Sequence, residues 1–126
     1  MADILDVSQL QTMTGGDAAL AAEALGIFRQ SYDMWGRMLD PHLPPQQWAD
    51  AAHGIKGAAL SIGAMALGEA CAAAEQLGKA GNASPAQAGV AISTIKDRMG
   101  EATEAIAELE HHLLVHRAFP KARSAD

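Results

Sequence analysis

The chain has 126 residues, the size of a single domain that can bury a core without disulfides. Hydrophobic residues make up 49% of it but aromatic residues only 4%, a composition that suits closely packed helices and is poor for sheets. The net charge of −6 argues against a nucleic-acid partner, and the single cysteine, Cys71, excludes an intrachain disulfide and a cysteine zinc cage.

The chain also lacks signals that would direct it to or through a membrane. Residues 1–3 do not begin the basic and apolar runs of a signal peptide. No apolar run approaches the roughly 20 residues that a membrane span needs. We therefore expect a soluble, cytoplasmic protein.

Glycines and prolines divide the chain into helical segments in chain order. A short helix is expected over about 8–13 with Ser8 as its N-cap, and a longer one follows over about 17–39. Pro45 suits the first position of a third helix that ends near residue 62. The fourth covers about 64–79, and the last runs over about 85–115 with Ser84 as its N-cap.

These segments predict an all-α fold, an up-down antiparallel four-helix bundle with a short additional N-terminal helix as a lid. No alternating run of β-branched residues predicts a sheet. Residues 1–118 are expected to form the domain, and residues 119–126 a disordered tail.

Apolar residues recur at helical spacing in the second and last helices, where we expect them in the core or at its edge. In the second helix they are Leu20, Ala24, Ile27, Phe28, Met34, Trp35, Met38 and Leu39. In the last helix they are Val90, Ile95, Met99, Ala102, Ile106, Leu109 and Leu113.

The third helix has one fully apolar side and a histidine opposite it. At about 100° per residue, the core side carries Trp48, Ala51, Ala52, Ile55, Ala58, Ala59 and Ile62. His53 is placed on the outer face, where a buried structural role is disfavoured. Its expected neighbours there are Ala49, Asp50, Lys56, Gly57, Leu60 and Ser61.

Three of these neighbours favour a function for His53 over an ordinary surface histidine. Lys56 is one turn away and could attract the oxygens of a phosphoryl group, although it could also be a plain solvated lysine. Gly57 costs the helix roughly 1 kcal/mol relative to alanine, which suggests that another molecule's backbone approaches closely. Leu60 could then belong to an apolar docking patch.

The run from His53 to Ala64, HGIKGAALSIGA, resembles the signature of the histidine-containing phosphotransfer (HPt) family of two-component phosphorelays: His, two residues, Lys-Gly, small residues, then Gly. The next helix continues the family pattern with Leu67, Cys71 and Glu75. The resemblance extends over roughly residues 3–115 and implies the helical bundle fold.

The resemblance also implies roles for individual residues. His53 would be phosphorylated, Lys56 would steady the phosphoryl oxygens, and Gly57 would leave room for a partner's loop. Glu75 matches a position that hydrogen-bonds the histidine in related chemotaxis domains, but it could equally be a plain surface acid. The expected partner-binding surface comprises Ala49, Asp50, Gly57, Leu60 and Ser61.

By this resemblance the chain is a phosphocarrier more than an autonomous kinase, because no glycine-rich nucleotide loop is present. Its partners would be response-regulator receiver domains or a hybrid histidine kinase, and it would be a monomer. It would bind no cofactor itself, and Mg²⁺ would be supplied by the partner receiver. The alternative is a non-catalytic docking module that binds the same partners without transfer.

A metal site is a weaker alternative. His112 and His116 have the i, i+4 spacing that can hold a metal, and Glu108 with His111 forms a Glu-x-x-His unit. A di-metal bundle needs two such inward-facing units, and the only analogue, at Asp50 and His53, is expected to point outward. Charged histidines near a helix C-terminus are explained sufficiently by its dipole.

Overall fold

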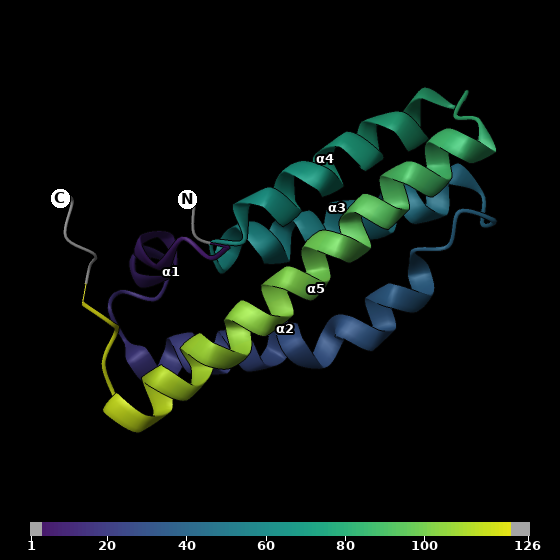
Figure 1. Cartoon of the computed structure of the whole chain (residues 1–126). Coiled ribbons are helices and arrows are strands. Elements are labelled where there is room, and N and C mark those ends of the chain that lie inside the picture. The colour runs from purple at the N-terminus through teal and green to yellow at the C-terminus, as the bar shows by residue number, and fades with distance from the viewer. Residues whose placement is uncertain (1–3, 122–126) are drawn as a thin grey trace, which may run out of the picture.

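The computed structural model describes residues 4–121 and shows five helices (Figure 1). They are α1 (Val7–Met13), α2 (Ala18–Met38), α3 (Pro45–Ser61), α4 (Met65–Ala80) and α5 (Pro85–His116). No strand forms within this range. The predicted all-α class is confirmed, and each expected helix boundary lies within two residues of the observed one.

Local side-chain chemistry explains where several helices start and stop. Asp6, Asp17 and Ser84 each accept a hydrogen bond from a backbone N–H of the first turn that follows, and Ser84 forms a full capping box with Gln87. Gly81 ends α4 in the left-handed conformation, at φ 79°. The Ser84 cap is confirmed. The Ser8 cap is wrong, because Asp6 caps α1 two residues earlier.

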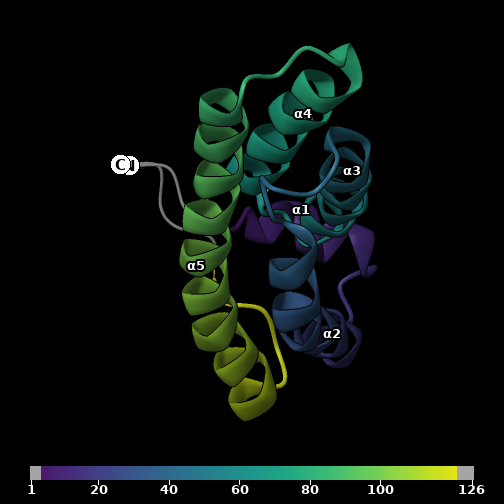
Figure 2. The ribbon, with the colours of Figure 1, turned by 90° about the vertical axis from the view of Figure 1, so that its right-hand side faces the viewer.

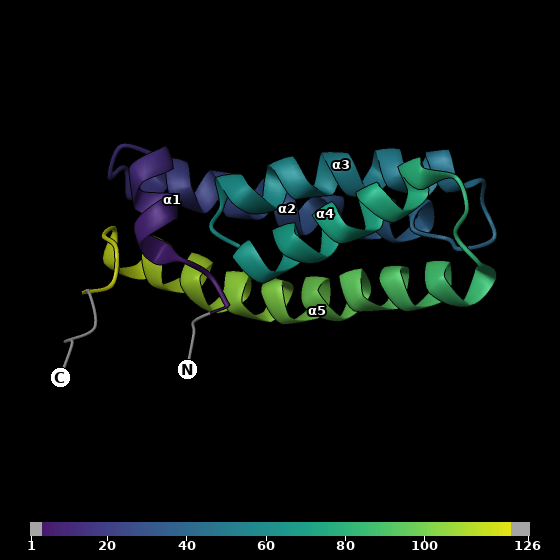
Figure 3. The ribbon, with the colours of Figure 1, turned by 90° about the horizontal axis from the view of Figure 1, so that it is seen from above.

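The four long helices surround one core, with α1 across one end. Seen from the right-hand side of Figure 1, α5, α4, α3 and α2 lie in this order around the core (Figure 2). From above, α5 runs the whole length of the bundle, and α1 lies at the end where α5 finishes (Figure 3). Helix α3 packs most extensively on α4, and α5 packs on both α2 and α4.

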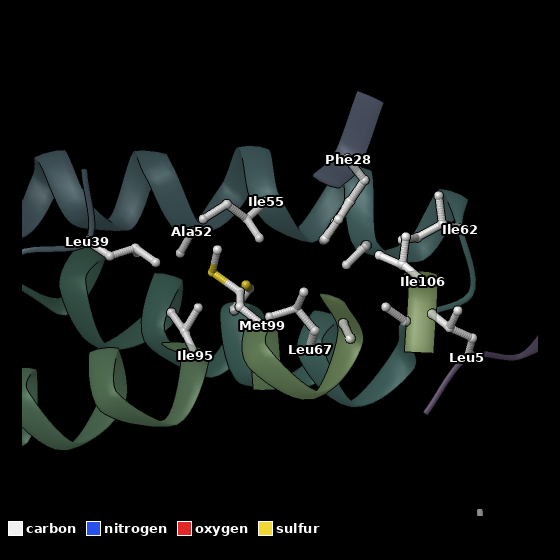
Figure 4. Close-up of a cluster of buried hydrophobic side chains, with 14 of the residues drawn as sticks. Leu5, Phe28, Leu39, Ala52, Ile55, Ile62, Leu67, Ile95, Met99 and Ile106 are labelled. Carbon is white, nitrogen blue, oxygen red and sulfur yellow. The ribbon is translucent and has the colours of Figure 1, made fainter. Parts of the chain in front are cut away.

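The core is a continuous layer of apolar, mostly aliphatic side chains drawn from every helix. It extends from Leu39 and Ile95 at one end to Leu5 and Ile62 at the other (Figure 4). All predicted core residues of α3 are buried except Ala58, which is partly buried. This side of α3 therefore fixes the helix in the bundle, and its opposite side faces outward.

Several expected core positions are exposed instead. In α2 these are Leu20, Ile27, Met34 and Met38, and in α5 it is Val90. Helix α2 turns Ala21, Leu25 and Phe28 inward, so the residues at the other apolar positions lie on its outer side. Periodicity alone did not separate the two faces, since α2 carries apolar residues on both. The rest of the α5 stripe, from Ile95 to Leu113, is buried as predicted.

The junction between α3 and α4 is held to the start of α1. Gly63 adopts φ 82°, and its carbonyl accepts a hydrogen bond from the Asp6 backbone N–H at 2.7 Å. A Cβ atom at residue 63 would overlap the Asp6 carbonyl, so both the conformation and the close approach require glycine. This contact fixes the chain at the end of the helix that carries His53.

Only the beginning of the expected C-terminal tail can be described. Phe119 is half-buried and packs against the core, so the chain stays in contact with the domain just after α5. Residues 122–126 lie outside the described residues. The proposed boundary between domain and tail stays a prediction.

Candidate functional site

His53 projects from α3 on the side away from the core, as the helical periodicity predicts. Its side chain is 65% exposed, although both Ala52 and Ile55 beside it are buried. The exposure allows a molecule of protein size to reach the imidazole ring. A role as a buried structural histidine is thereby ruled out.

The ring is nevertheless held from below by Glu75 of α4. The Nδ1 atom of His53 lies 2.8 Å from Oε2 of Glu75, whose side chain is only 8% exposed. Lys56 donates a hydrogen bond to Oε1 of the same carboxylate at 2.8 Å, and Lys79 donates one to Oε2 at 2.7 Å. One carboxylate therefore joins three side chains from two helices.

The electrostatics of this cluster determine which ring nitrogen of neutral His53 carries the proton. Hydrogen bonds from Lys56 first and Lys79 second, with a smaller contribution from His53, lower the pKa of Glu75 from 4.5 to about 2, while burial acts in the opposite direction. Glu75 is thus a carboxylate at neutral pH and can only accept hydrogen bonds. The proton of a neutral His53 must therefore lie on Nδ1, which leaves the lone pair on Nε2.

Two glycines leave the surface beside His53 free of side chains. Gly57 is exposed, and apart from its chain neighbours and the backbone of its own helix, a Cβ atom there would meet nothing within 4 Å; the same holds for Gly54. The fold itself therefore does not require glycine at residue 57. Leu60 is 38% exposed and lies across Gly68 of α4, where it supplies an apolar surface one turn beyond Gly57.

The other residues predicted to contact a partner are divided between the surface and the core. Asp50 is exposed and accepts a hydrogen bond from Gln46 at 2.8 Å, and Ser61 is exposed at the end of α3. The prediction for Ala49 is wrong, because this residue is completely buried. Gly78 lets α4 approach so closely that an added Cβ would lie 2.7 Å from Cβ of Ala49, and α4 therefore covers this flank of α3.

Cys71 lies on α4, one turn before Glu75, and is fully buried. Burial is the main cause that raises the pKa of its thiol to about 12. The thiol stays protonated at neutral pH and is shielded from solvent. Cys71 thus packs in the core as a small apolar residue.

Lys79 is the member of the cluster that the sequence analysis missed. It follows Glu75 by four residues on α4, and Glu followed by Lys at this spacing is a common stabilising pair on a helix. The interaction raises the pKa of Lys79 mainly through its hydrogen bond to Glu75. This spacing was the available signal, but it does not distinguish an ordinary surface pair from one that also contacts His53.

The C-terminal histidines lie apart from this cluster. The rings of His112 and His116 lie with centroids 4.4 Å apart on the last turns of α5. Between residues 4 and 121, no group of three or more His, Cys, Asp or Glu side chains gathers as a metal site would require. In the same range, no helix is long and apolar enough to cross a bilayer.

The fold and the cluster together define a class of protein: a helical bundle that exposes a carboxylate-oriented imidazole on its surface. A family model described as the Hpt domain matches residues 21–113, most of the chain. The chain therefore belongs to the Hpt domain family. His53 lies within the matched range, as do Lys56, Glu75 and Lys79.

A solved structure supports the same assignment. The fold is similar to the crystal structure of the histidine phosphotransferase ShpA from Caulobacter crescentus, with a TM-score of 0.67 and 32% sequence identity. The similarity covers 90% of this chain and 97% of ShpA. Among curated proteins, none matches the chain significantly.

The paired carboxylate predicts a specific dependence of stability on pH. The pKa of Glu75 is lower in the folded chain than its ordinary value of 4.5, so its pairing stabilises the fold above that value. This contribution is lost as the pH falls from about 4.5 toward about 2. Urea unfolding of the Glu75→Gln variant should show a smaller loss of stability across this window than the wild type does. If the free energy of unfolding fell equally with pH in both proteins, the lowered pKa of Glu75 would be contradicted.

Proposed function

We propose that this chain relays a phosphoryl group between aspartates of response-regulator receiver domains through a phosphohistidine at His53. The observation that carries the proposal is the exposed imidazole whose Nδ1 is bound to the ionised, buried Glu75. That arrangement offers Nε2 as a nucleophile to a partner while the ring is held in one orientation. The chain would act as a phosphocarrier, and we expect it to do so in the cytoplasm as a monomer.

The transfer needs no other reactant from this chain. Nε2 of His53 would attack the phosphorus of the partner's aspartyl phosphate in line, forming the N–P bond as the P–O bond to the aspartate breaks. The aspartate carboxylate is the leaving group, and the reverse reaction passes the phosphoryl group to another receiver. Mg²⁺ bound by the receiver would neutralise the phosphoryl oxygens during transfer.

Glu75 would contribute to both states of the ring. When Nε2 carries the phosphoryl group and Nδ1 keeps its proton, the imidazole ring itself is cationic. The hydrogen bond to the Glu75 carboxylate at 2.8 Å is then charge-assisted on both sides and therefore stronger. Glu75 would thus help the ring to accept the group as well as orient it for attack.

Lys56 is placed to assist once the phosphoryl group is present. It follows His53 by one turn of α3, its side chain is 29% exposed, and its ammonium group is bound to Oε1 of Glu75. A flexible lysine side chain anchored in this way can turn toward new anionic oxygens without leaving the site. We propose that Lys56 is shared between Glu75 and the phosphoryl group after transfer.

The partner would dock over the outer face of α3. Gly57 leaves open space beside His53, and Leu60 gives this face an apolar contact. Asp50 and Ser61 flank these residues at the surface. A receiver's active-site loop could approach the backbone of α3 here, so that its aspartyl phosphate reaches Nε2.

Phosphoryl transfer to the wild type and to the His53→Gln variant tests the proposal. Incubation with a labelled, phosphorylated receiver domain should label the wild type, and the label should be acid-labile and alkali-stable. The variant should receive none and should melt within a few degrees of the wild type, because the replaced side chain is exposed. Binding of receivers without any labelling of the wild type would instead indicate a docking module that transfers nothing.

The docking surface can be tested separately with Gly57→Arg. An arginine at this open position should obstruct the partner's approach and slow transfer by about tenfold or more, since a single steric clash of about 1.4 kcal/mol already has that effect. Gly89→Arg is the matched control, because Gly89 of α5 also has no neighbour within 4 Å of an added Cβ. Equal transfer rates for the two variants would place the docking surface elsewhere.

A further inference from the structure

Two donors share one oxygen atom of Glu75. Oε2 accepts hydrogen bonds from Nδ1 of His53 at 2.8 Å and from Nζ of Lys79 at 2.7 Å, whereas Oε1 accepts one from Lys56. Lys79 is 54% exposed at its side chain, so burial does not force it into this contact. Its ammonium group and the imidazole therefore donate to the same acceptor oxygen.

The shared oxygen matters because His53 must be unprotonated at Nε2 to act as a nucleophile. A carboxylate beside an imidazole favours the protonated imidazolium, because opposite charges attract. An imidazolium has no lone pair and cannot attack phosphorus. Glu75 acting alone would therefore orient His53 but would also favour the form of the ring that cannot react.

The positive charges of Lys56 and Lys79 oppose the stabilisation of the imidazolium by Glu75. With neutral His53, the cluster of Glu75, Lys56 and Lys79 carries a net charge of one positive unit, which opposes a further proton on the ring. Asp50 is a weaker influence that acts on Lys79. Cys71, whose thiol lies near Lys56 and Glu75, is buried and keeps its proton at neutral pH.

We propose that Lys79 is a positioning residue for the phosphotransfer reaction: by sharing Oε2 with Nδ1, it lets Glu75 orient His53 without stabilising the protonated, non-nucleophilic ring. Lys56 is bound to the other oxygen and cannot make this contact with Oε2 in the same arrangement. The inference rests on the proposed transfer through His53, but its effect on the ring exists without any partner.

The test compares Lys79→Met with the conservative Lys79→Arg and with the control Lys96→Met. Lys96 is an exposed lysine of α5, outside the cluster. The readout is ¹⁵N NMR of the His53 imidazole in the unphosphorylated protein, recorded over a pH series. Loss of the Lys79 charge should move the midpoint of imidazole protonation to higher pH, because a nearby cation opposes the charged form of the ring.

Lys79→Arg should restore the wild-type midpoint, and Lys96→Met should leave it unchanged. In transfer assays, the acid limb of the rate profile of Lys79→Met should move to higher pH by the same amount. A midpoint that does not move, or that moves equally in Lys96→Met, would overturn the proposal. A wild type that accepts no phosphoryl group would refute the function instead, and the NMR titration would still show whether Lys79 controls the ring.

Discussion

The carboxylate of Glu75 is the interaction on which the site depends. It lies almost completely buried between α3 and α4, where an unpaired charge would be costly, and it is compensated by His53, Lys56 and Lys79. Because the two lysines keep it ionised, it can only accept, and this fixes the tautomer of the exposed histidine. The packing of α4 against α3 therefore determines which nitrogen of the exposed His53 ring carries the proton.

The close contact of α3 and α4 makes this possible. Gly78 allows α4 to approach Ala49 and Trp48, and Gly68 lies beneath Leu60. These contacts bring Glu75 within hydrogen-bonding distance of His53 although 22 residues separate them in the chain. On the outer side of α3, Gly54 and Gly57 leave the surface bare. Glycines of α4 thus allow close packing against α3, and glycines of α3 leave its outer face accessible.

Much of this arrangement could be predicted from the sequence. The spacing of apolar residues placed His53 opposite the core of α3, and capping chemistry located the start of α5 at Ser84. The role of Glu75 as the hydrogen-bond partner of His53 came from resemblance to a family, because contact between residues of different helices cannot be read from either helix alone. For the same reason Ala49 was assigned to the wrong surface and the contribution of Lys79 was missed. In α2, apolar residues on both faces concealed which of them are buried.

The central claim is that Glu75 holds the proton on Nδ1, so that Nε2 receives the phosphoryl group. Combined ³¹P and ¹⁵N NMR of the phosphorylated, ¹⁵N-histidine-labelled protein identifies the nitrogen bonded to phosphorus. The structure predicts a phosphorus–nitrogen coupling to Nε2 of His53 and a protonated Nδ1. Phosphorus bonded to Nδ1, or to any residue other than His53, would contradict the account.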